Sequence, residues 1–246
     1  MPARRFSTTP ASASDQASLF GDDTASHEIH RLFFALMPDE PAIAAISEVA
    51  ARLRAAHSMR GKPILPERYH ATLNFLGDND RLRPDWVERA GRAAGRVRVE
   101  PCEVRLDRAC VFQRRGGASP CVLKGPADDA LMALWSTLRR ELVVGGFGKE
   151  LDHAFVPHVT WIYSRDGFPE QAIEPIRWSV RDFVLVHSIV HDPEYRILGR
   201  WALTSGPGSG SVSNPFPVWS RDAPYAKLGL CQNVSNDPEI LWPWPS

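Results

Sequence analysis

Two short segments of the sequence carry the same pattern, a histidine and a threonine separated by one residue. His70 and Thr72 form the first segment, and His158 and Thr160 form the second. An imidazole titrates near about pH 6.5, so one histidine of a pair can accept a proton while the other, already protonated, donates one. A threonine hydroxyl can donate a hydrogen bond to a phosphate oxygen. Two such segments on either side of a phosphodiester can therefore carry out an in-line displacement without a metal ion.

This pattern is uncommon by chance. The chain has eight histidines and seven threonines, and random placement gives only about 0.2 occurrences of the spacing in a chain of this length. The alternative interpretation is structural, with both histidines as half-buried strand residues that make ordinary hydrogen bonds. Surface or structural roles are expected for the six histidines that lack the following threonine, namely His27, His30, His57, His153, His187 and His191.

Both segments begin short apolar runs, which predict strands over residues 70–76 and 158–163. Because side chains alternate across a strand, each histidine shares a face with its threonine. The residues predicted to face the core on the other side of these strands are Ala71, Leu73, Phe75, Val159 and Trp161.

The elements that must position these strands occur twice in the same order. An apolar strand over 31–36 and a helix capped by Asp39 precede the first segment, which begins 39 residues after the strand. A strand over 121–123 and a helix capped by Asp128 or Asp129 precede the second, at a distance of 37 residues. The repeat predicts an α+β domain of two lobes with pseudo-twofold symmetry. The remaining predicted elements are a helix from Pro84 to about 97 and strands over 102–112, 180–190 and 195–203.

Composition changes at both ends of this pattern. Residues 1–29 are rich in Ser, Thr, Ala and Asp and are predicted to be a disordered leader. Residues 205–246 are rich in Gly, Pro and Trp without helix or strand periodicity, and no role is assigned to this tail. The sequence therefore predicts one folded domain over 30–204.

Charge and cysteine content exclude several classes of function. No apolar run approaches the ~20 residues of a membrane span, and the N-terminus lacks the apolar region of a secretory signal. The four cysteines form no C-x-x-C pair, so neither a zinc site nor a disulfide framework is indicated, and a monomer in the reducing cytoplasm is expected.

Residues 30–204 carry 25 basic and 22 acidic side chains. This balance is too small for nucleic-acid binding by bulk charge, so a polyanionic partner has to be bound locally.

Several stretches resemble one known family. They are RLFFAL, PERYHATLNFLGD, FVPHVTW, FVLVHSIV and YRILGRWAL, and they fall in order between 31 and 203. In these the chain resembles the 2H phosphoesterase superfamily, and within it the bacterial RNA 2′,3′-cyclic phosphodiesterases, also called 2′-5′ RNA ligases. The resemblance implies a bilobal fold of two antiparallel sheets that line a central cleft, with the helices outside. It also implies hydrolysis of 2′,3′-cyclic phosphate ends of RNA or of cyclic nucleotides to 2′-phosphomonoesters, with weak reverse 2′-5′ ligation.

The resemblance also implies roles for the paired segments. His70 corresponds to the histidine that protonates the departing 3′ oxygen, and His158 to the one that activates water. Thr72 and Thr160 correspond to the phosphate-binding hydroxyls. No cofactor is expected, because the chain has no phosphate-binding glycine loop, dinucleotide fingerprint or H-E-x-x-H segment.

One position departs from the family pattern. Bacterial members often have arginine in H-x-T-x-x-R, whereas this chain has Tyr163 there and Arg165 two positions later. Arg165 is therefore a candidate substitute for the family arginine. Tyr69 and Tyr163, close to the two histidines, are candidates for stacking on a nucleobase.

Two other classes of function remain open from the sequence. The same cleft would suit a non-catalytic module that binds RNA ends or nucleotides. The histidines would also suit a metal-dependent hydrolase, although no carboxylate or cysteine stands at ligand spacing from them. A separate hypothesis concerns the leader, where Gln16–Phe20 resembles the Q-x-x-L-F peptides that dock in grooves of bacterial sliding clamps.

Overall fold

The computed structural model describes residues 28–114, 116–149, 151 and 154–204. The leader up to residue 27, with its Gln16–Phe20 motif, and the tail over 205–246 lie outside these ranges. The elements of the described residues are β1 (His30–Leu36), α1 (Glu40–Ala56), a 3-10 turn (Pro66–Arg68), β2 (Ala71–Asn79), α2 (Pro84–Ala94), β3 (Cys102–Val111), β4 (Ser119–Lys124), α3 (Asp129–Leu142), a π turn (Val143–Phe147), β5 (His158–Ser164), β6 (Gln171–Val180), β7 (Asp182–Ile189) and β8 (Tyr195–Ala202).

The predicted helix starts are confirmed, and each has a clear local cause. The Asp39 carboxylate accepts a hydrogen bond from the backbone N–H of Ala42 at 3.0 Å and caps α1. Asp128, rather than Asp129, caps α3 by accepting from the backbone N–H of Leu131 at 2.8 Å. Such caps satisfy N–H groups that have no partner within the helix.

One strand was not predicted from the sequence. β6 occupies residues 171–180, so Val180 ends this strand instead of beginning the next one. β6 is the edge strand of the sheet and contains Pro175. A proline lacks the backbone donor that an inner strand needs, and it therefore weakens the strand pattern without preventing an edge strand.

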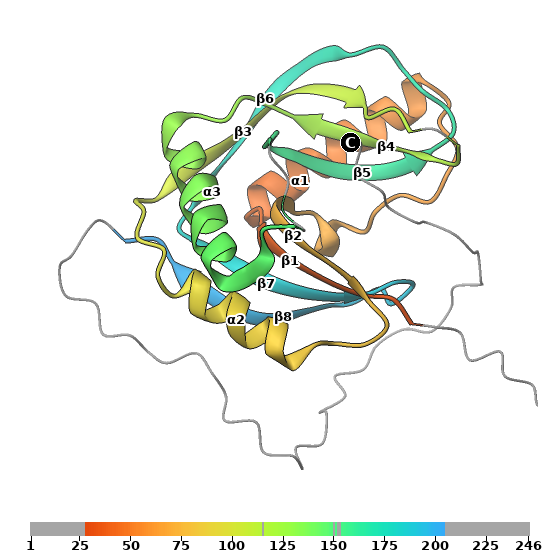
Figure 1. Cartoon of the computed structure of the whole chain (residues 1–246). Coiled ribbons are helices and arrows are strands. Elements are labelled where there is room, and N and C mark those ends of the chain that lie inside the picture. Colours follow the sequence, from red (N-terminus) through yellow and green to blue (C-terminus); the bar gives the residue numbers. More distant parts are fainter. Residues whose placement is uncertain (1–27, 115, 150, 152–153, 205–246) are drawn as a thin grey trace, which may run out of the picture.

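The sheet order is symmetric about its centre. It runs β6-β3-β4-β5-β2-β1-β7-β8, with antiparallel pairing throughout. The predicted units β1-α1-β2 and β4-α3-β5 occupy equivalent places on either side of the centre. The two halves, β6-β3-β4-β5 and β2-β1-β7-β8, lie one above the other in Figure 1. The predicted α+β fold with pseudo-twofold symmetry is confirmed, and its two sheets are joined into one where β2 meets β5.

The helices tie the two halves together. Helix α1, which follows β1, contacts β5 and β6 of the other half, while α3, which follows β4, contacts both β3 and β2 (Figure 1). Helix α2 packs on α3 and β8. One large apolar cluster, the main core, therefore runs under both halves and includes Phe34, Leu76, Leu138, Trp161 and Phe183. No helix within the described ranges is long and apolar enough to cross a membrane.

Candidate active site

The two His-x-Thr segments meet at the centre of the sheet. The β2–β5 junction consists of a single pair, Ala71 with Val159, and both residues are fully buried in the main core. In an antiparallel pair the residues on either side of this pair lie across from one another. His70 is therefore placed across from Thr160, and Thr72 across from His158, on the sheet face opposite the main core. The structure brings the four side chains singled out by sequence together around one point.

Both imidazoles are held in the same way. The Nδ1 atom of His70 lies 2.8 Å from the carbonyl oxygen of Arg68, and that of His158 lies 2.7 Å from the carbonyl oxygen of Val156. A carbonyl oxygen only accepts hydrogen bonds, so each Nδ1 carries the proton and donates it. The Nε2 atom of each neutral ring is then left with a lone pair. Each histidine therefore offers one site of proton exchange, at Nε2.

The surroundings favour the neutral form of both rings. Burial above all, together with the nearby charges of His158 and Arg68, lowers the pKa of His70 to about 4, while the bond to the Arg68 carbonyl acts in the opposite direction. Burial also lowers the pKa of His158, while its bond to the Val156 carbonyl acts in the opposite direction.

Aromatic rings pack against each imidazole. The His70 ring lies 5.0 Å from the Phe33 ring and 5.4 Å from the Tyr195 ring, the latter edge-on. The Phe112 ring lies 5.0 Å from the His158 ring, also edge-on. These contacts restrict the rotation of both imidazoles and so help to hold each Nε2 in place.

Arg68 places a positive charge beside His70. Its guanidinium stacks 4.4 Å from the centre of the Tyr195 ring and donates hydrogen bonds to the backbone of Asp192 at 3.1 Å and to the Ser188 hydroxyl at 3.5 Å. Its Nε atom is buried and has no hydrogen-bond partner among the residues that the structure describes. The positive charge of Arg68 makes a small contribution to the lowered pKa of His70.

Two β-bulges change which side chains reach the site. The first bulge is in β2, where the register shifts between the partners of Phe34 and Ala35 of β1. The second is in β5, where the register with β4 shifts at Trp161. A bulge inserts one residue and reverses the alternation beyond it. Phe75, expected in the main core, instead packs against a small cluster with Phe33, on the side of His70.

The same reversal affects Tyr163. Ile162 belongs to the main core, so the next residue on β5 is directed to the face that carries His158. Tyr163 is half-buried and lies in register with Pro120 of β4. It therefore occupies a position equivalent to that of Phe75, five residues after the histidine of its own segment.

The other predicted residues have mixed outcomes. Trp161 is in the main core as expected. Tyr69 is only 4% exposed and also lies in the main core, where burial raises the pKa of its hydroxyl. The prediction that Tyr69 can stack on a nucleobase is therefore wrong, because it alternates with His70 and points the opposite way. Arg165 is exposed, one residue beyond the end of β5, and its role as a phosphate contact stays a prediction.

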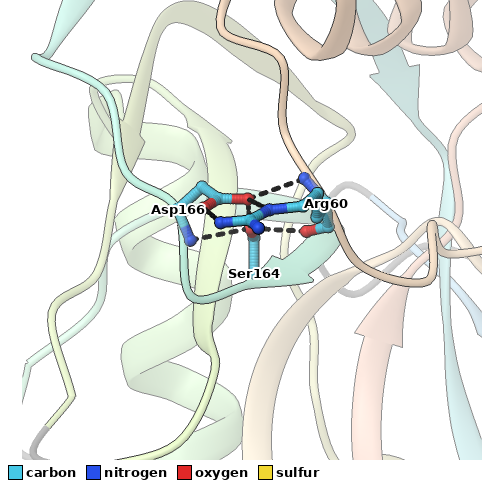
Figure 2. A network of polar contacts seen from close by, with 3 residues as sticks. All are labelled: Arg60, Ser164 and Asp166. Carbon is cyan, nitrogen blue, oxygen red and sulfur yellow. Dashed lines mark hydrogen bonds and ion pairs between the residues drawn. The ribbon is translucent and has the colours of Figure 1, made fainter.

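A polar cluster fastens the loop before His70 to the strand that starts at His158. Figure 2 shows Arg60, Ser164 and Asp166. Arg60 donates from its backbone N–H and its guanidinium to the Asp166 carboxylate at 2.8–3.2 Å, and Ser164 donates to the Arg60 carbonyl at 2.6 Å. The bonds from Arg60 lower the pKa of Asp166 to about 2. The loop continues along β5, where the N–H of Ile64 donates to the carbonyl of Trp161.

We expect Gly61→Ala to distort this attachment. Gly61 has a φ of 129°, and a Cβ atom there would lie 2.3 Å from the backbone carbonyl oxygen of Tyr163. The strain lowers the free energy of unfolding by about 1–3 kcal/mol, which urea denaturation measures. Gly167→Ala is the matched control, since a Cβ at Gly167 meets nothing within 4 Å. Equal stability of the two variants would show that the close approach of the loop to β5 is unimportant.

Sequence reasoning missed several residues of this site. Arg68 lies two positions before His70, Tyr195 begins β8, and Lys124 ends β4 in register with His158. Only Lys124 gave a signal, as a charged residue that ends the apolar run Cys-Val-Leu. Across the part of the chain that the structure describes, no three His, Cys, Asp or Glu side chains are grouped closely enough to hold a metal ion.

Comparison with known proteins agrees with this geometry. The family model for LigT like phosphoesterases matches residues 36–122. An RNA 2′,3′-cyclic phosphodiesterase of Thermus thermophilus is 30% identical over 199 residues, which cover 75% of this chain and 96% of that protein. The chain belongs to the LigT-like phosphoesterase family. The resemblance inferred from the two His-x-Thr segments is thereby confirmed.

Solved structures place this LigT-like phosphoesterase in the same fold. The crystal structure of E. coli LigT in its apo form matches with a TM-score of 0.54 and 25% identity, covering 72% of this chain and 99% of that one. A crystal structure of a Thermus thermophilus protein matches with a TM-score of 0.54 and 26% identity, covering 72% and 100%. E. coli LigT complexed with ATP matches with a TM-score of 0.51 and 26% identity, over 72% and 100% of the two chains.

Proposed function

We propose that this protein hydrolyses 2′,3′-cyclic phosphate ends of RNA, or cyclic nucleotides, to 2′-phosphomonoesters without a metal ion. The observation that carries the proposal is the arrangement of the two His-x-Thr segments around the Ala71–Val159 pair. Each histidine donates from Nδ1 to a backbone carbonyl, which leaves two equivalent Nε2 atoms on one face of the sheet. The relative from Thermus thermophilus is named as an enzyme of this activity.

In the first half of the proposed reaction, His158 activates water. Its neutral Nε2 accepts a proton from the water molecule as the water oxygen forms a bond to phosphorus. The lowered pKa keeps His158 neutral at physiological pH, so the lone pair is available. Its Nδ1–H bond to the Val156 carbonyl supports the positive charge that the ring acquires.

In the second half, His70 protonates the leaving group. The bond between phosphorus and the 3′ oxygen breaks, the proton on Nε2 of His70 passes to that oxygen, and the product is a 2′-phosphate with a free 3′-hydroxyl. His70 needs a second proton for this step, although burial favours its neutral form. The negative charge of the bound phosphate stabilises the imidazolium and so raises the pKa of His70 in the complex.

The two threonines complete the site. Thr72 and Thr160 lie across from the histidines of the opposite segment, and their hydroxyls can donate to the two non-bridging phosphate oxygens. Weak 2′-5′ ligation is expected from the same site, because a 5′-hydroxyl can replace water as the attacking group.

The pH dependence of turnover follows from the two lowered pKa values. His158 has to be neutral, and it gains a proton only as the pH falls through a pKa below 6.5. His70 has to be protonated, and in the free protein this form declines as the pH rises above about 4. The profile of kcat/KM is therefore bell-shaped, with its maximum on the acid side of about pH 6.5. The basic limb of the kcat profile lies at higher pH than that of kcat/KM, because bound phosphate favours the imidazolium form of His70. Steady-state kinetics across about pH 4–9 test this, and a kcat/KM without a basic limb would contradict the assignment.

The decisive assay for the activity is turnover of adenosine 2′,3′-cyclic phosphate in EDTA. The proposal predicts hydrolysis at an unchanged rate with 2′-AMP as the product, identified by phosphorus NMR. Binding without turnover would favour a nucleotide-binding module. Turnover that EDTA abolishes and zinc restores would favour a metal-dependent hydrolase. Either outcome would overturn the proposal.

A further inference from the structure

A row of basic side chains leads away from His158 across the sheet. Arg108 of β3 is in register with Lys124 of β4, and Lys124 is in register with His158 of β5. The adjacent row is formed by Ala109, Leu123 and Val159, all fully buried in the main core. Because side chains alternate across a strand, the basic row lies on the opposite face, together with the two histidines.

The spacing of this row suits a second phosphate. Neighbouring strands are about 4.8 Å apart, so the backbone of Lys124 is about 5 Å from that of His158, and the backbone of Arg108 is about 10 Å away. A cyclic phosphate held by the histidines therefore has two cations beside it, at one and two strand spacings. A chain with a further phosphodiester can reach them, whereas a cyclic mononucleotide has no second phosphate to place there.

These two cations already hold an anionic group. The Lys124 ammonium lies 2.8 Å from one carboxylate oxygen of Glu170, and the Arg108 guanidinium lies 3.8 Å from the other. Through this hydrogen bond Glu170 raises the pKa of Lys124, and Lys124 lowers the pKa of Glu170. Glu170 comes from the segment between β5 and β6, and its side chain is 43% exposed. Exposed ion pairs contribute little stability, so a phosphate group can displace this carboxylate.

In the other half of the sheet, the described residues that continue the row from Thr72 are apolar, Ala35 of β1 and Val184 of β7. Its face beside His70 carries the small apolar cluster, which consists of Phe33, Ala35, Val184 and Val186 with Met37, Phe75 and Tyr195 packed against it. The guanidinium of Arg68 also lies on this side, where it is engaged with the Tyr195 ring and the backbone of Asp192. An extended polyanion is therefore favoured on the side of Lys124 and Arg108.

We propose that Lys124 and Arg108 form a subsite for the phosphodiester that precedes the terminal nucleotide of an RNA, and that this phosphodiester displaces the Glu170 carboxylate. The inference rests on the proposed function, since it assumes that the cyclic phosphate is bound between His70 and His158. It makes the protein selective for RNA ends over cyclic mononucleotides.

The test compares two substrates in the full-length protein. One is adenosine 2′,3′-cyclic phosphate, and the other is the dinucleotide ApA with a 2′,3′-cyclic phosphate end, which has one additional phosphodiester. The quantity measured is the ratio of kcat/KM for the dinucleotide to that for the mononucleotide. We expect Arg108→Met to lower this ratio about tenfold, as the loss of one charge-assisted contact does, and Glu170→Gln to raise it several-fold by removing the competing carboxylate.

Controls separate this inference from the function itself. Arg92→Met removes an equally exposed arginine that pairs with Glu88 on α2, and it should leave the ratio unchanged. The ratio of the unmodified protein should also decline as salt increases, and less so for Arg108→Met. Turnover of both substrates with the same ratio in all variants would overturn the subsite and leave the function intact. No turnover of either substrate by the unmodified protein would overturn the proposed function.

Discussion

Replacing His158 or His70 by alanine should lower kcat for a 2′,3′-cyclic phosphate by about 10²–10⁴, because each variant removes one of two proton transfers. The arrangement of the site makes both losses comparable. Each ring is held by one Nδ1 bond and one or two aromatic contacts, and each offers a single Nε2 atom. None of the other polar side chains identified at the site, which are those of Thr72, Thr160, Arg68, Lys124 and Tyr195, can replace an imidazole that both accepts and donates a proton near neutral pH.

The fold-losses in kcat of the two single variants should not multiply in the variant that lacks both histidines. Groups that act in one step are strongly non-additive, so His70→Ala combined with His158→Ala should be close to the worse single variant. Initial rates at substrate saturation measure this. His191→Asn is a suitable control, because His191 lies in the β7–β8 turn with a φ of 75°, which asparagine tolerates. Full activity in either single variant would contradict the mechanism.

Trp161→Ala should lower the free energy of unfolding by about 3–5 kcal/mol, the usual range for a large aromatic side chain removed from a core. Trp161 is 1% exposed, contacts the Phe168 ring and occupies the bulge of β5 directly after Thr160. Its loss leaves a cavity beneath the strand that carries His158, so we expect turnover to fall as well.

Trp161→Phe should be much milder, with a loss below about 1.5 kcal/mol. The indole Nε1 atom of Trp161 is buried and has no hydrogen-bond partner within the described ranges, so phenylalanine removes a polar group that gains nothing from burial. Urea denaturation monitored by circular dichroism compares the two variants, with Val156→Ala as an exposed control at 48% exposure. A Trp161→Ala variant as stable as this control would show that the bulge is not anchored by the core.

The sequence predicts most elements of this fold because local signals and burial agree there. The Asp39 and Asp128 caps and the apolar face of α3 each follow from residues close in the chain. The path of β6 does not, since the partner that pairs with it, β3, lies about 70 positions earlier. The two bulges cannot be predicted from the sequence for the same reason, because an inserted residue is defined only relative to the partner strand. Side-chain alternation alone therefore predicts the wrong face for Phe75.

The residues of the candidate site also fall into two groups, those that a local sequence pattern identifies and those that only the folded structure brings to the site. His70, Thr72, His158 and Thr160 could be identified because each segment has a local pattern and the pattern is repeated. Arg68 and Tyr195 reach the site through contacts that no local pattern reports, and the local signal of Lys124 does not reveal its register with His158. Tyr69 illustrates the opposite error. It is next to His70 in the sequence, but its side chain lies in the core and does not reach the site.

The most direct measurement of the central claim is a crystal structure of the protein with 2′-AMP, the product of the proposed reaction. The Nε2 atoms of His70 and His158 should each lie about 2.6–3.2 Å from an oxygen bound to the same phosphorus or from the 3′-hydroxyl. The hydroxyls of Thr72 and Thr160 should donate to the remaining phosphate oxygens. A phosphate that contacts only one imidazole, or that binds away from both, would contradict the account.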